Sequence, residues 1–317
     1  MFMKCLLIFI HLLCLFDISE ACSCSKIDYK PYSKRVRFLT RLPNSKKIRN
    51  LALIGSYSSL SYMANLEESR AQELTMDQQL KYGVRFFDIG VIPKSKSLAV
   101  YLDEETPCID LVEGLDPIER FLKDNPGEIV MVHFAQVFPL SINVTKGLCD
   151  ILNSLRENGV GKRFVTNWTL EDPIGKHRGK ILLASLDFAF YGCAFSLRSE
   201  CNINYDFVNR YESPITDFRE KWESIINLIR ASFSGIEKCY VNNMSLIDGK
   251  HSRRAISKDG GYKYEYSCIK PINHLIAQNF KKPSRRLVIV LMEFLTQNAI
   301  DKVGDSNFAP NIKWRFS

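Results

Sequence analysis

The sequence predicts a single α/β domain built as a (β/α)8 TIM-type barrel. Apolar runs alternate with amphipathic helical patterns along most of the 317 residues, and neither an internal repeat nor a linker rich in Pro, Gly and Ser interrupts them. The apolar runs are nearly continuous, which is typical of parallel strands that helices cover on both faces. About six runs are clear where a regular barrel has eight strands, which leaves room for an irregular barrel.

Each predicted strand is a short run of mostly Val, Ile, Leu and Phe. The first strand leads directly into Gly55 and Ser56, which are predicted to form a turn. In a barrel, such a turn at the carboxyl end of a strand belongs to the face that carries the active site. The predicted strands are Leu51–Ile54, Val84–Val91, Leu98–Leu102, Ile129–Val137, Ile181–Leu186 and Leu287–Leu295.

Helical patterns lie between most of these strands. Thr75–Tyr82 is the shortest and has clear boundaries, because Thr75 is a favourable N-cap and Gly83 a favourable stop. The other helices have apolar residues three and four positions apart, the spacing that gives a helix one apolar face. They are Leu115–Lys123, Thr145–Glu157, Ile215–Phe233 and Pro271–Phe280. The stretches Phe188–Arg210 and Asn242–Ser267 show no clear pattern.

Residues 1–21 have the pattern of a secretory signal peptide. Lys4 precedes the apolar run Cys5–Phe16, and Ser19 and Ala21 place small residues at the positions that signal peptidase reads. A retained anchor is the alternative, but this run and all later ones fall short of the ~18 apolar residues of a membrane helix. We therefore expect a secreted, extracellular protein without a transmembrane segment. Its parts are the signal peptide, a basic N-terminal arm over residues 22–50 and the barrel over residues 51–317.

The cysteines agree with secretion. Eight remain after the predicted signal peptide, an even number that favours disulfides in a secreted chain. Local spacing suggests one pair, Cys193–Cys201, because only a short polar loop separates the two. Metal binding is the weaker interpretation, since no Cys-x-x-Cys or His-x-x-x-His spacing occurs, and we expect no cofactor. The disulfide candidates are Cys22, Cys24, Cys108, Cys149, Cys193, Cys201, Cys239 and Cys268.

Acceptor sequons and basic clusters suggest what the surface carries. Asn143, Asn167 and Asn243 each begin a sequon for N-glycosylation. The formal net charge is +8, and basic residues concentrate in Lys34–Arg49 and Lys281–Arg286. Phosphoinositide headgroups, anionic membrane surfaces and glycans are therefore candidate partners, with a solvated face as the alternative. We expect no nucleic-acid partner, because the secreted chain has no recognisable module for one.

Two segments resemble the X domain of phosphatidylinositol-specific phospholipases C, particularly the bacterial-type members with a single X domain. They are Leu51–Tyr62 (LALIGSYSSLSY) and Gln79–Val91 (QLKYGVRFFDIGV). The family has I-P-G-[ST]-H-D-S in the first and Q-L-x-x-G-[VI]-R-[FY]-[FL]-D-[IL]-R in the second. Phe121–Val132, Arg178–Leu183 and the last predicted strand extend the resemblance from about Leu51 to Asn307.

The resemblance implies that the catalytic groups of the family are replaced. Tyr57 stands where the family has its first histidine, Ser58 where it has aspartate and Gly90 where bacterial-type members have arginine. Leu102 occupies the place of the second histidine. In the family, these histidines move the protons of a phosphoryl transfer while arginine or calcium neutralises developing charge. A phenol has an unperturbed pKa of ~10 and leucine has no proton to move, so we expect inherited catalysis to be lost.

Three carboxylates fall at positions that the resemblance makes informative. Asp88 aligns with a carboxylate beside the catalytic arginine or calcium, and we favour a structural role for it. Asp217 resembles a residue that lines the headgroup pocket, although a rim carboxylate is the favoured alternative. Glu293 resembles the carboxylate that orients the first histidine, with Tyr57 as its partner here. His133 shares the parity of Met131 and is expected to be a core histidine.

We therefore predict a secreted phospholipase C-like barrel that is catalytically inactive and acts by binding. The first alternative is an active phosphodiesterase with a rearranged site formed by Tyr57, Asp88 and His133. The second is an extracellular interaction protein that uses the outside of the barrel, for which an exposed apolar patch would be the sign.

Overall fold

The computed structural model describes residues 26–94, 97–137, 142–157, 159–204, 216–235, 238–260, 263–264, 267–280, 283 and 285–308. The predicted signal peptide, Cys22 and Cys24 lie outside these ranges. Within the described residues, no helix is both long and apolar enough to cross a membrane. The strands are β1 (Ala52–Ser56), β2 (Phe86–Lys94), β3 (Ser97–Val100), β4 (Ile109–Asp110), β5 (Val130–Gln136), β6 (Phe164–Val165), β7 (Ile181–Ser185), β8 (Phe195–Ser196), β9 (Cys201–Ile203), β10 (Cys239–Asn243), β11 (Lys263–Tyr264), β12 (Ser267–Cys268) and β13 (Leu287–Met292).

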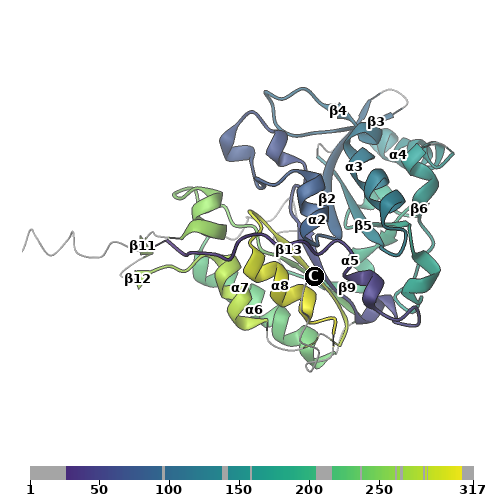
Figure 1. Cartoon of the computed structure of the whole chain (residues 1–317). Coiled ribbons are helices and arrows are strands. Elements are labelled where there is room, and N and C mark those ends of the chain that lie inside the picture. Colours follow the sequence, from purple (N-terminus) through teal and green to yellow (C-terminus); the bar gives the residue numbers. More distant parts are fainter. Residues whose placement is uncertain are drawn as a thin grey trace, which may run out of the picture.

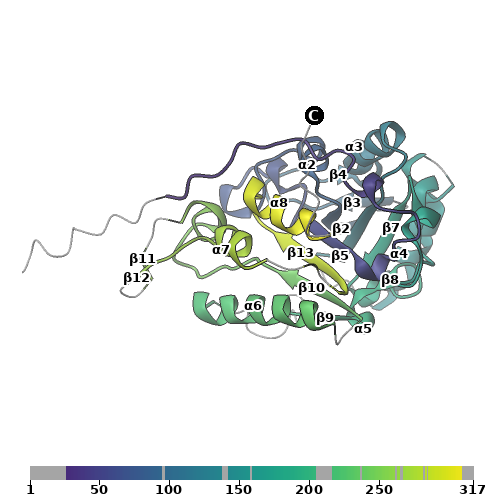
Figure 2. The same ribbon diagram turned by 60° about the horizontal axis from the view of Figure 1, so that its bottom comes forward.

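A curled, mainly parallel sheet forms the centre of the fold. Its strands follow the order β6-β7-β5-β2-β1-β13-β10-β9, while β8 adds to β7, and every neighbouring pair among these is parallel. Helices surround the sheet on the outside (Figure 1; Figure 2). The predicted α/β barrel class is confirmed, and so is its irregularity: within the described residues β8 and β9 do not pair, and the short α5 (Leu197–Glu200) connects them.

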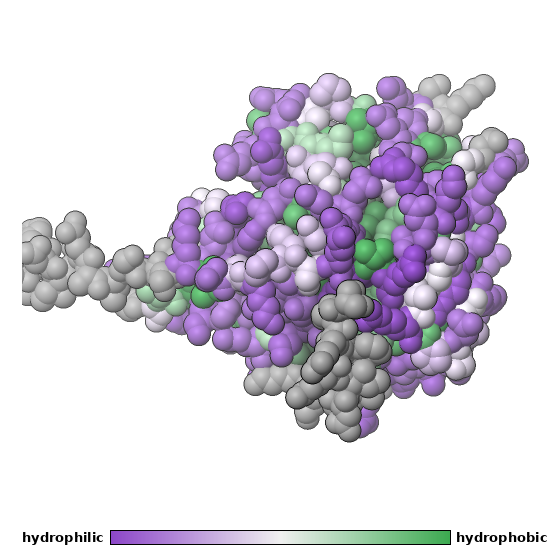
Figure 3. Space-filling model, viewed as in Figure 1, coloured by the Kyte–Doolittle hydropathy of each residue, from purple (hydrophilic) through white to green (hydrophobic). Residues whose placement is uncertain are grey.

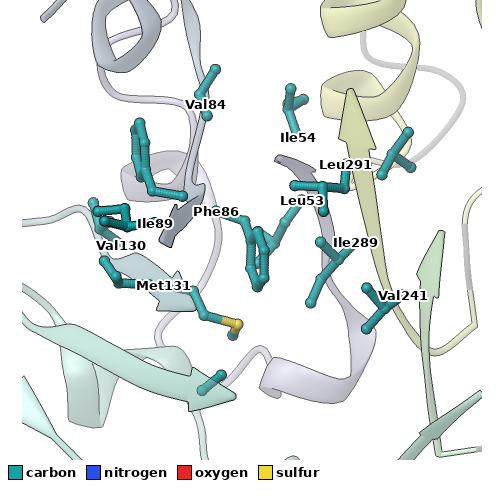
Figure 4. Close-up of a cluster of buried hydrophobic side chains, with 14 of the residues drawn as sticks. Leu53, Ile54, Val84, Phe86, Ile89, Val130, Met131, Val241, Ile289 and Leu291 are labelled. Atoms are coloured by element: carbon teal, nitrogen blue, oxygen red, sulfur yellow. The ribbon is translucent and has the colours of Figure 1, made fainter. Parts of the chain in front are cut away.

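Side chains of alternating parity fill the inside of the barrel. Leu53 is aligned with Ile289, and Phe86 is aligned with Met131. All four are buried and converge on the interior, whereas Ile54 points away toward the helix that follows β13 (Figure 4). This alternation is the period of two that a strand imposes. It places the next inward positions, at the carboxyl ends of the strands, in one shared layer.

Two strand predictions need correction. Gly55 and Ser56 continue β1 instead of forming a turn, because they pair with Leu291 and Met292 of β13. The strand predicted at Leu98–Leu102 is antiparallel to β2, as β3 of a hairpin, and is not a parallel barrel strand. Hydrophobic alternation is the same for both orientations, so the sequence pattern could not separate them.

The observed helices are close to the predicted ones. The predicted boundaries of α2 are confirmed: Thr75 forms a capping box with Gln78, and Gly83 ends the helix with a φ of 110°. The largest shift is at α3, which begins at Leu111 instead of Leu115 because Asp110 caps it, and α6 begins at Phe218 because Asp217 caps it. The helices are α2 (Met76–Tyr82), α3 (Leu111–Asp124), α4 (Ile142–Leu155), α5 (Leu197–Glu200), α6 (Phe218–Ser234), α7 (Ile272–Asn279) and α8 (Gln297–Asp305).

The described part of the predicted basic arm packs against the barrel. Leu39 and Ile48 are fully buried in the core. The Arg35 guanidinium forms ion pairs with Asp301 and Asp305 at the end of α8, at 2.9 and 2.7 Å. This segment therefore helps to close the end of the barrel at which the strands begin.

A buried ion pair holds the beginnings of β2 and β5 together. Arg85 Nε donates to Glu128 Oε2 at 2.8 Å, and neither side chain is exposed. The guanidinium also donates to the carbonyls of Leu80, Val84 and Val36, and burial lowers the pKa of Arg85. These acceptors replace the water that the Arg85 guanidinium loses on burial and so offset much of the cost of burying its charge.

The predicted pairing of Cys193 with Cys201 is wrong. Cys193 is bonded to Cys149 of α4, and Cys201 is bonded to Cys239. Cys201 and Cys239 are aligned in the parallel ladder of β9 and β10, which brings their Cα atoms to 4.4 Å. Cys268 is disulfide-bonded as well, and Cys108 is a free, half-buried thiol. Strand adjacency, which sequence spacing does not reveal, therefore decided the pairing of Cys201 with Cys239.

Candidate functional site

Polar side chains occupy the inward positions at the carboxyl ends of three barrel strands. Asp88 lies two positions beyond Phe86 in β2, and His133 lies two positions beyond Met131 in β5. Glu293 follows β13 directly, two positions beyond Leu291. All three are buried, at 7%, 1% and 0% exposure, respectively. The strand period thus places the side chains that the sequence singled out at the end of a barrel where active sites form.

The segment after β1 crosses this end of the barrel. Tyr57 donates its backbone N–H to Met292 O at 2.9 Å, which ties the segment to β13. Ser58 has a φ of 45°, a left-handed conformation that is uncommon outside glycine. Ser59 returns the chain to β2, because its N–H donates to Asp88 O at 2.8 Å and its Oγ accepts from Asp88 N at 2.9 Å. These bonds set the direction in which Tyr57 and Ser58 present their side chains.

Asp88 connects the segment after β1 to β5. Its Oδ1 lies 2.7 Å from His133 Nδ1, and its Oδ2 accepts from the Ser58 N–H at 3.0 Å. This amide bond also stabilises the left-handed conformation of Ser58. The expectation of a core histidine at position 133 agrees with its burial, and the structural role that we predicted for Asp88 agrees with these contacts.

Glu293 is surrounded by donors from the loop after β10. Its Oε1 accepts from Ser245 Oγ at 2.8 Å and from Arg253 Nη1 at 3.0 Å, and its Oε2 accepts from Ser257 Oγ at 3.0 Å. Burial raises the pKa of Glu293, while Arg253, the two hydroxyls and Lys221 of α6 oppose that rise. The main partner of this carboxylate is therefore a guanidinium. Tyr57, the partner that the resemblance implied, interacts with the charge of Glu293 and is hydrogen-bonded to the Ser245 side chain.

The Tyr57 phenol lies close to Asp88 and Glu293. Burial raises the pKa of Tyr57 above its ordinary value of 10.0, the negative charges of Asp88 and Glu293 add to that rise, and Arg253 opposes it. The Arg253 guanidinium lies 5.8 Å from the centre of the Tyr57 ring. A phenol in this environment stays protonated near neutral pH, so it can donate a hydrogen bond but cannot serve as a base.

The two remaining replaced positions lie next to apolar side chains. A Cβ atom on Gly90 would come within 2.8 Å of Val137 Cγ2, so a side chain at this position would displace Val137. Leu102 is 9% exposed and belongs to the hydrophobic core, just past the end of β3. Val137 thus limits the side chain that position 90 could carry, and position 102 lies in an apolar environment.

The other predicted sites have mixed outcomes. Asp217 caps α6, with its Oδ1 accepting from the backbone N–H groups of Arg219 and Glu220 at 2.9 and 3.0 Å. Among the sequons, Asn167 is exposed. Asn243 is only 2% exposed and accepts from Ser245 N at 3.0 Å, so this fold is incompatible with a glycan at that position. The side chain of Asn143 lies outside the described residues.

Sequence reasoning missed the groups that surround Glu293. Arg253 follows His251 in a polar loop without periodicity. Lys221 is a charged residue on the mostly apolar, buried side of α6. Lys221 is fully buried, and burial lowers its pKa to about 7 in spite of Glu293. The available signal was a lysine on the apolar side of a helix. Within the described ranges, no three His, Cys, Asp or Glu side chains are grouped so as to hold a metal ion.

Solved structures with a similar fold are bacterial phosphatidylinositol-specific phospholipases C. The Listeria monocytogenes enzyme is 17% identical, with a TM-score of 0.63 over 87% of this chain and 100% of that chain. A pentafluoro-Phe-containing form of the Staphylococcus aureus enzyme is 19% identical, with a TM-score of 0.66 over 87% and 100%. Another structure of the S. aureus enzyme, described for the modulation of its membrane binding, is 18% identical, with a TM-score of 0.64 over 86% and 97%. No family model and no curated protein matches the chain. The shared feature is thus the fold.

Proposed function

We propose that the protein is a secreted, non-catalytic relative of the phosphatidylinositol-specific phospholipases C that binds anionic phospholipid surfaces. The buried network around Glu293 carries the first part of this proposal. In a catalytic barrel, the carboxylate at this position would orient a base, but here Arg253, Ser245 and Ser257 engage both of its oxygens. The protonated phenol at position 57 cannot serve as a base, and the leucine at position 102 has no proton to move.

Exposed apolar side chains at the same end of the barrel support the second part. Phe188 and Tyr191 follow β7, Ile247 follows β10 and Met63 follows β1, with exposures of 70%, 77%, 53% and 39%. We call these four residues the apolar rim. Exposed apolar and aromatic residues around a protein surface mark membrane or partner contacts, and aromatic rings suit the boundary between lipid and water.

Basic side chains accompany the apolar rim. The Arg198 guanidinium lies 4.5 Å from the centre of the Phe188 ring, and Lys250 is exposed three positions beyond Ile247. An anionic headgroup beside the inserted rings would therefore meet positive charge. On the face seen in Figure 3, apolar residues form separate small patches among hydrophilic ones, which suits reversible contact.

One measurement separates binding from catalysis. The purified protein is added to phosphatidylcholine vesicles with and without phosphatidylinositol, and both sedimentation with vesicles and inositol phosphate release are followed, with and without calcium. We expect sedimentation with the anionic vesicles and no release above that of heat-inactivated protein. The double variant Phe188→Ser/Tyr191→Ser should lose sedimentation, whereas Lys180→Ser/Lys238→Ser, at the other end of the barrel, should retain it.

A second candidate function is phosphodiesterase activity at a rearranged site. The observation in its favour is the carboxylate–imidazole pair of Asp88 and His133, since a carboxylate often orients a catalytic histidine. The burial of His133 opposes it, because a base must contact the substrate. Inositol phosphate release that is lost in His133→Asn would favour this function and overturn the non-catalytic one.

A further inference from the structure

The end of the barrel opposite the apolar rim is basic. Arg49 lies three residues before β1, and Lys180, Lys238 and Arg286 directly precede β7, β10 and β13. Parallel strands begin at one edge of their sheet, so these side chains gather at one end of the barrel. We call this end the basic face.

The carboxylates at the centre of the basic face are already paired. Glu171 accepts from Lys47 Nζ at 2.8 Å and from Arg49 Nη1 at 2.7 Å. Glu200 accepts from Lys238 Nζ at 2.9 Å. Arg285 and Arg286 add two further cations, and the Arg285 carbonyl accepts from Asn50, next to Arg49, at 3.3 Å. The basic residues thus outnumber these two carboxylates, and a positive potential remains for an anionic partner.

A pocket of about 420 Å³ opens at the centre of this face. Arg49, Lys238 and Arg286 line it from the starts of β1, β10 and β13, together with Glu171, Glu200, Thr169, Leu170 and Phe195. Phe195 belongs to β8 and Glu200 directly precedes β9, so the pocket lies where these two strands fail to pair. Its volume falls in the range of small-ligand sites.

An aromatic wall completes the pocket. Phe195 stacks on Trp168 with 4.1 Å between ring centroids and an interplanar angle of 23°. Trp168 is in turn held by a hydrogen bond from its Nε1 to Leu183 O at 2.8 Å. One face of the Phe195 ring is thereby fixed against the core, and the half-buried ring lines the pocket beside the cations.

We propose that the basic face binds an anionic polysaccharide, with one sulfated sugar residue seated in the pocket. Sulfate groups along such a chain would meet the cations, and the apolar face of a sugar ring would lie against Phe195. A lipid surface fits this face less well, because none of the large exposed apolar side chains among the described residues lines the pocket. This site is separate from the apolar rim and does not depend on the function proposed there.

The test is calorimetric titration of the full chain with a heparin octasaccharide. In Lys238→Ser/Arg285→Ser, two exposed cations of the basic face are removed. The matched control Lys94→Ser/Lys250→Ser removes two exposed lysines, one at the last position of β2 and one in the loop after β10. We expect the first variant to bind about tenfold more weakly, as two surface charge contacts would give, and the control to change less than about twofold. Both should keep the thermal unfolding temperature of the parent.

Three results would overturn the proposal. The parent chain could fail to bind the octasaccharide at physiological ionic strength. The two double variants could weaken binding equally, which would indicate attraction to net charge without a site. Finally, the basic-face variant could retain octasaccharide binding while losing sedimentation with phosphatidylserine vesicles, which would make this face a membrane contact.

Discussion

The His133 imidazole and the Asp88 carboxylate form a buried pair across two adjacent barrel strands, with Nδ1 2.7 Å from Oδ1. The two residues are aligned in the parallel ladder of β2 and β5, so the strand register itself brings them together. The second oxygen of Asp88 accepts from the Ser58 N–H. One carboxylate therefore links β2 to β5 and to the segment after β1, at the carboxyl ends of the barrel strands.

We predict that this pair stabilises the fold and does not catalyse a reaction. Asp88→Asn should lower the free energy of unfolding by about 1–3 kcal/mol, because a charged acceptor of two buried hydrogen bonds is lost. Urea unfolding measures this change. Asp77→Asn removes an exposed carboxylate that forms an ion pair with the exposed Arg120, and should cost less than about 0.5 kcal/mol. Equal stability of Asp88→Asn and the parent would contradict the structural role.

A second prediction concerns the space beside Gly90. Gly90→Ala should destabilise the protein by about 1–3 kcal/mol, because its Cβ would come within 2.8 Å of the short Val137 side chain. Gly147→Ala is the matched control: it lies in α4 with no atom within 4 Å of the new Cβ. Helix propensity alone should then stabilise that variant by about 0.5–1 kcal/mol. Thermal unfolding shifts of opposite sign would support the filled space at position 90, whereas two upward shifts would contradict it.

Much of the barrel could be predicted from the sequence because strand and helix signals are local. The alternation in Ile129–Val137 correctly predicted that His133 points inward. Thr75 and Gly83 correctly predicted both ends of α2. The orientation of β3 could not be obtained in this way, because a strand has the same alternation in parallel and antiparallel ladders.

The candidate site was less predictable because its partners come from distant segments. Arg253 contacts Glu293 across forty positions, and nothing in its polar surroundings indicates that it turns inward. The pairing of Cys201 with Cys239 required knowing that β9 and β10 are neighbours. Such contacts depend on tertiary adjacency, and a single sequence does not encode adjacency as a local pattern.

The ion pair between Arg85 and Glu128 should be among the most sensitive points of the fold. Glu128→Gln should lower the free energy of unfolding by about 3–5 kcal/mol, because the buried Arg85 charge would lose the carboxylate that it pairs with and keep only neutral acceptors. The control Glu119→Gln removes the carboxylate of a half-exposed pair with Arg163 and should cost at most about 1 kcal/mol. Chemical denaturation compares the two. Similar losses of unfolding free energy in both variants would mean that burial does not determine how much an ion pair contributes to stability.

The observed disulfides lead to a fourth prediction. Peptide mapping without reduction should find Cys149 linked to Cys193 and Cys201 linked to Cys239. Cys201→Ser/Cys239→Ser should lower the free energy of unfolding by about 2–4 kcal/mol, since a loop of 38 residues would be released in the unfolded chain. Cys108→Ser replaces a free thiol and should change stability little. A Cys193–Cys201 peptide would contradict the fold around β8 and β9.

The last prediction follows from the buried lysine beside Glu293. Burial lowers the pKa of Lys221 from 10.5 to about 7. Between these two values, the unfolded chain binds a proton at Lys221 that the folded protein does not. The free energy of unfolding should therefore rise with pH in this window, by about 1.4 kcal/mol per pH unit from this group alone. Below pH 7, both states are protonated, and the cost of burying the charge is present in full.

Urea unfolding of the parent and of Lys221→Met at pH values of about 8 and 9.5 tests this linkage. Lys221→Met should show a smaller rise than the parent, and it should be the more stable protein at the lower pH because its folding does not require a lysine to lose its proton. The pKa values of Tyr29, Tyr32 and Tyr57 are all raised, so their effects begin at higher pH and are common to both proteins. Lys250→Met, at an exposed position, should keep the slope of the parent. Identical slopes for Lys221→Met and the parent would show that the Lys221 ammonium keeps an ordinary pKa in the folded protein, and that the Glu293 carboxylate stabilises it there.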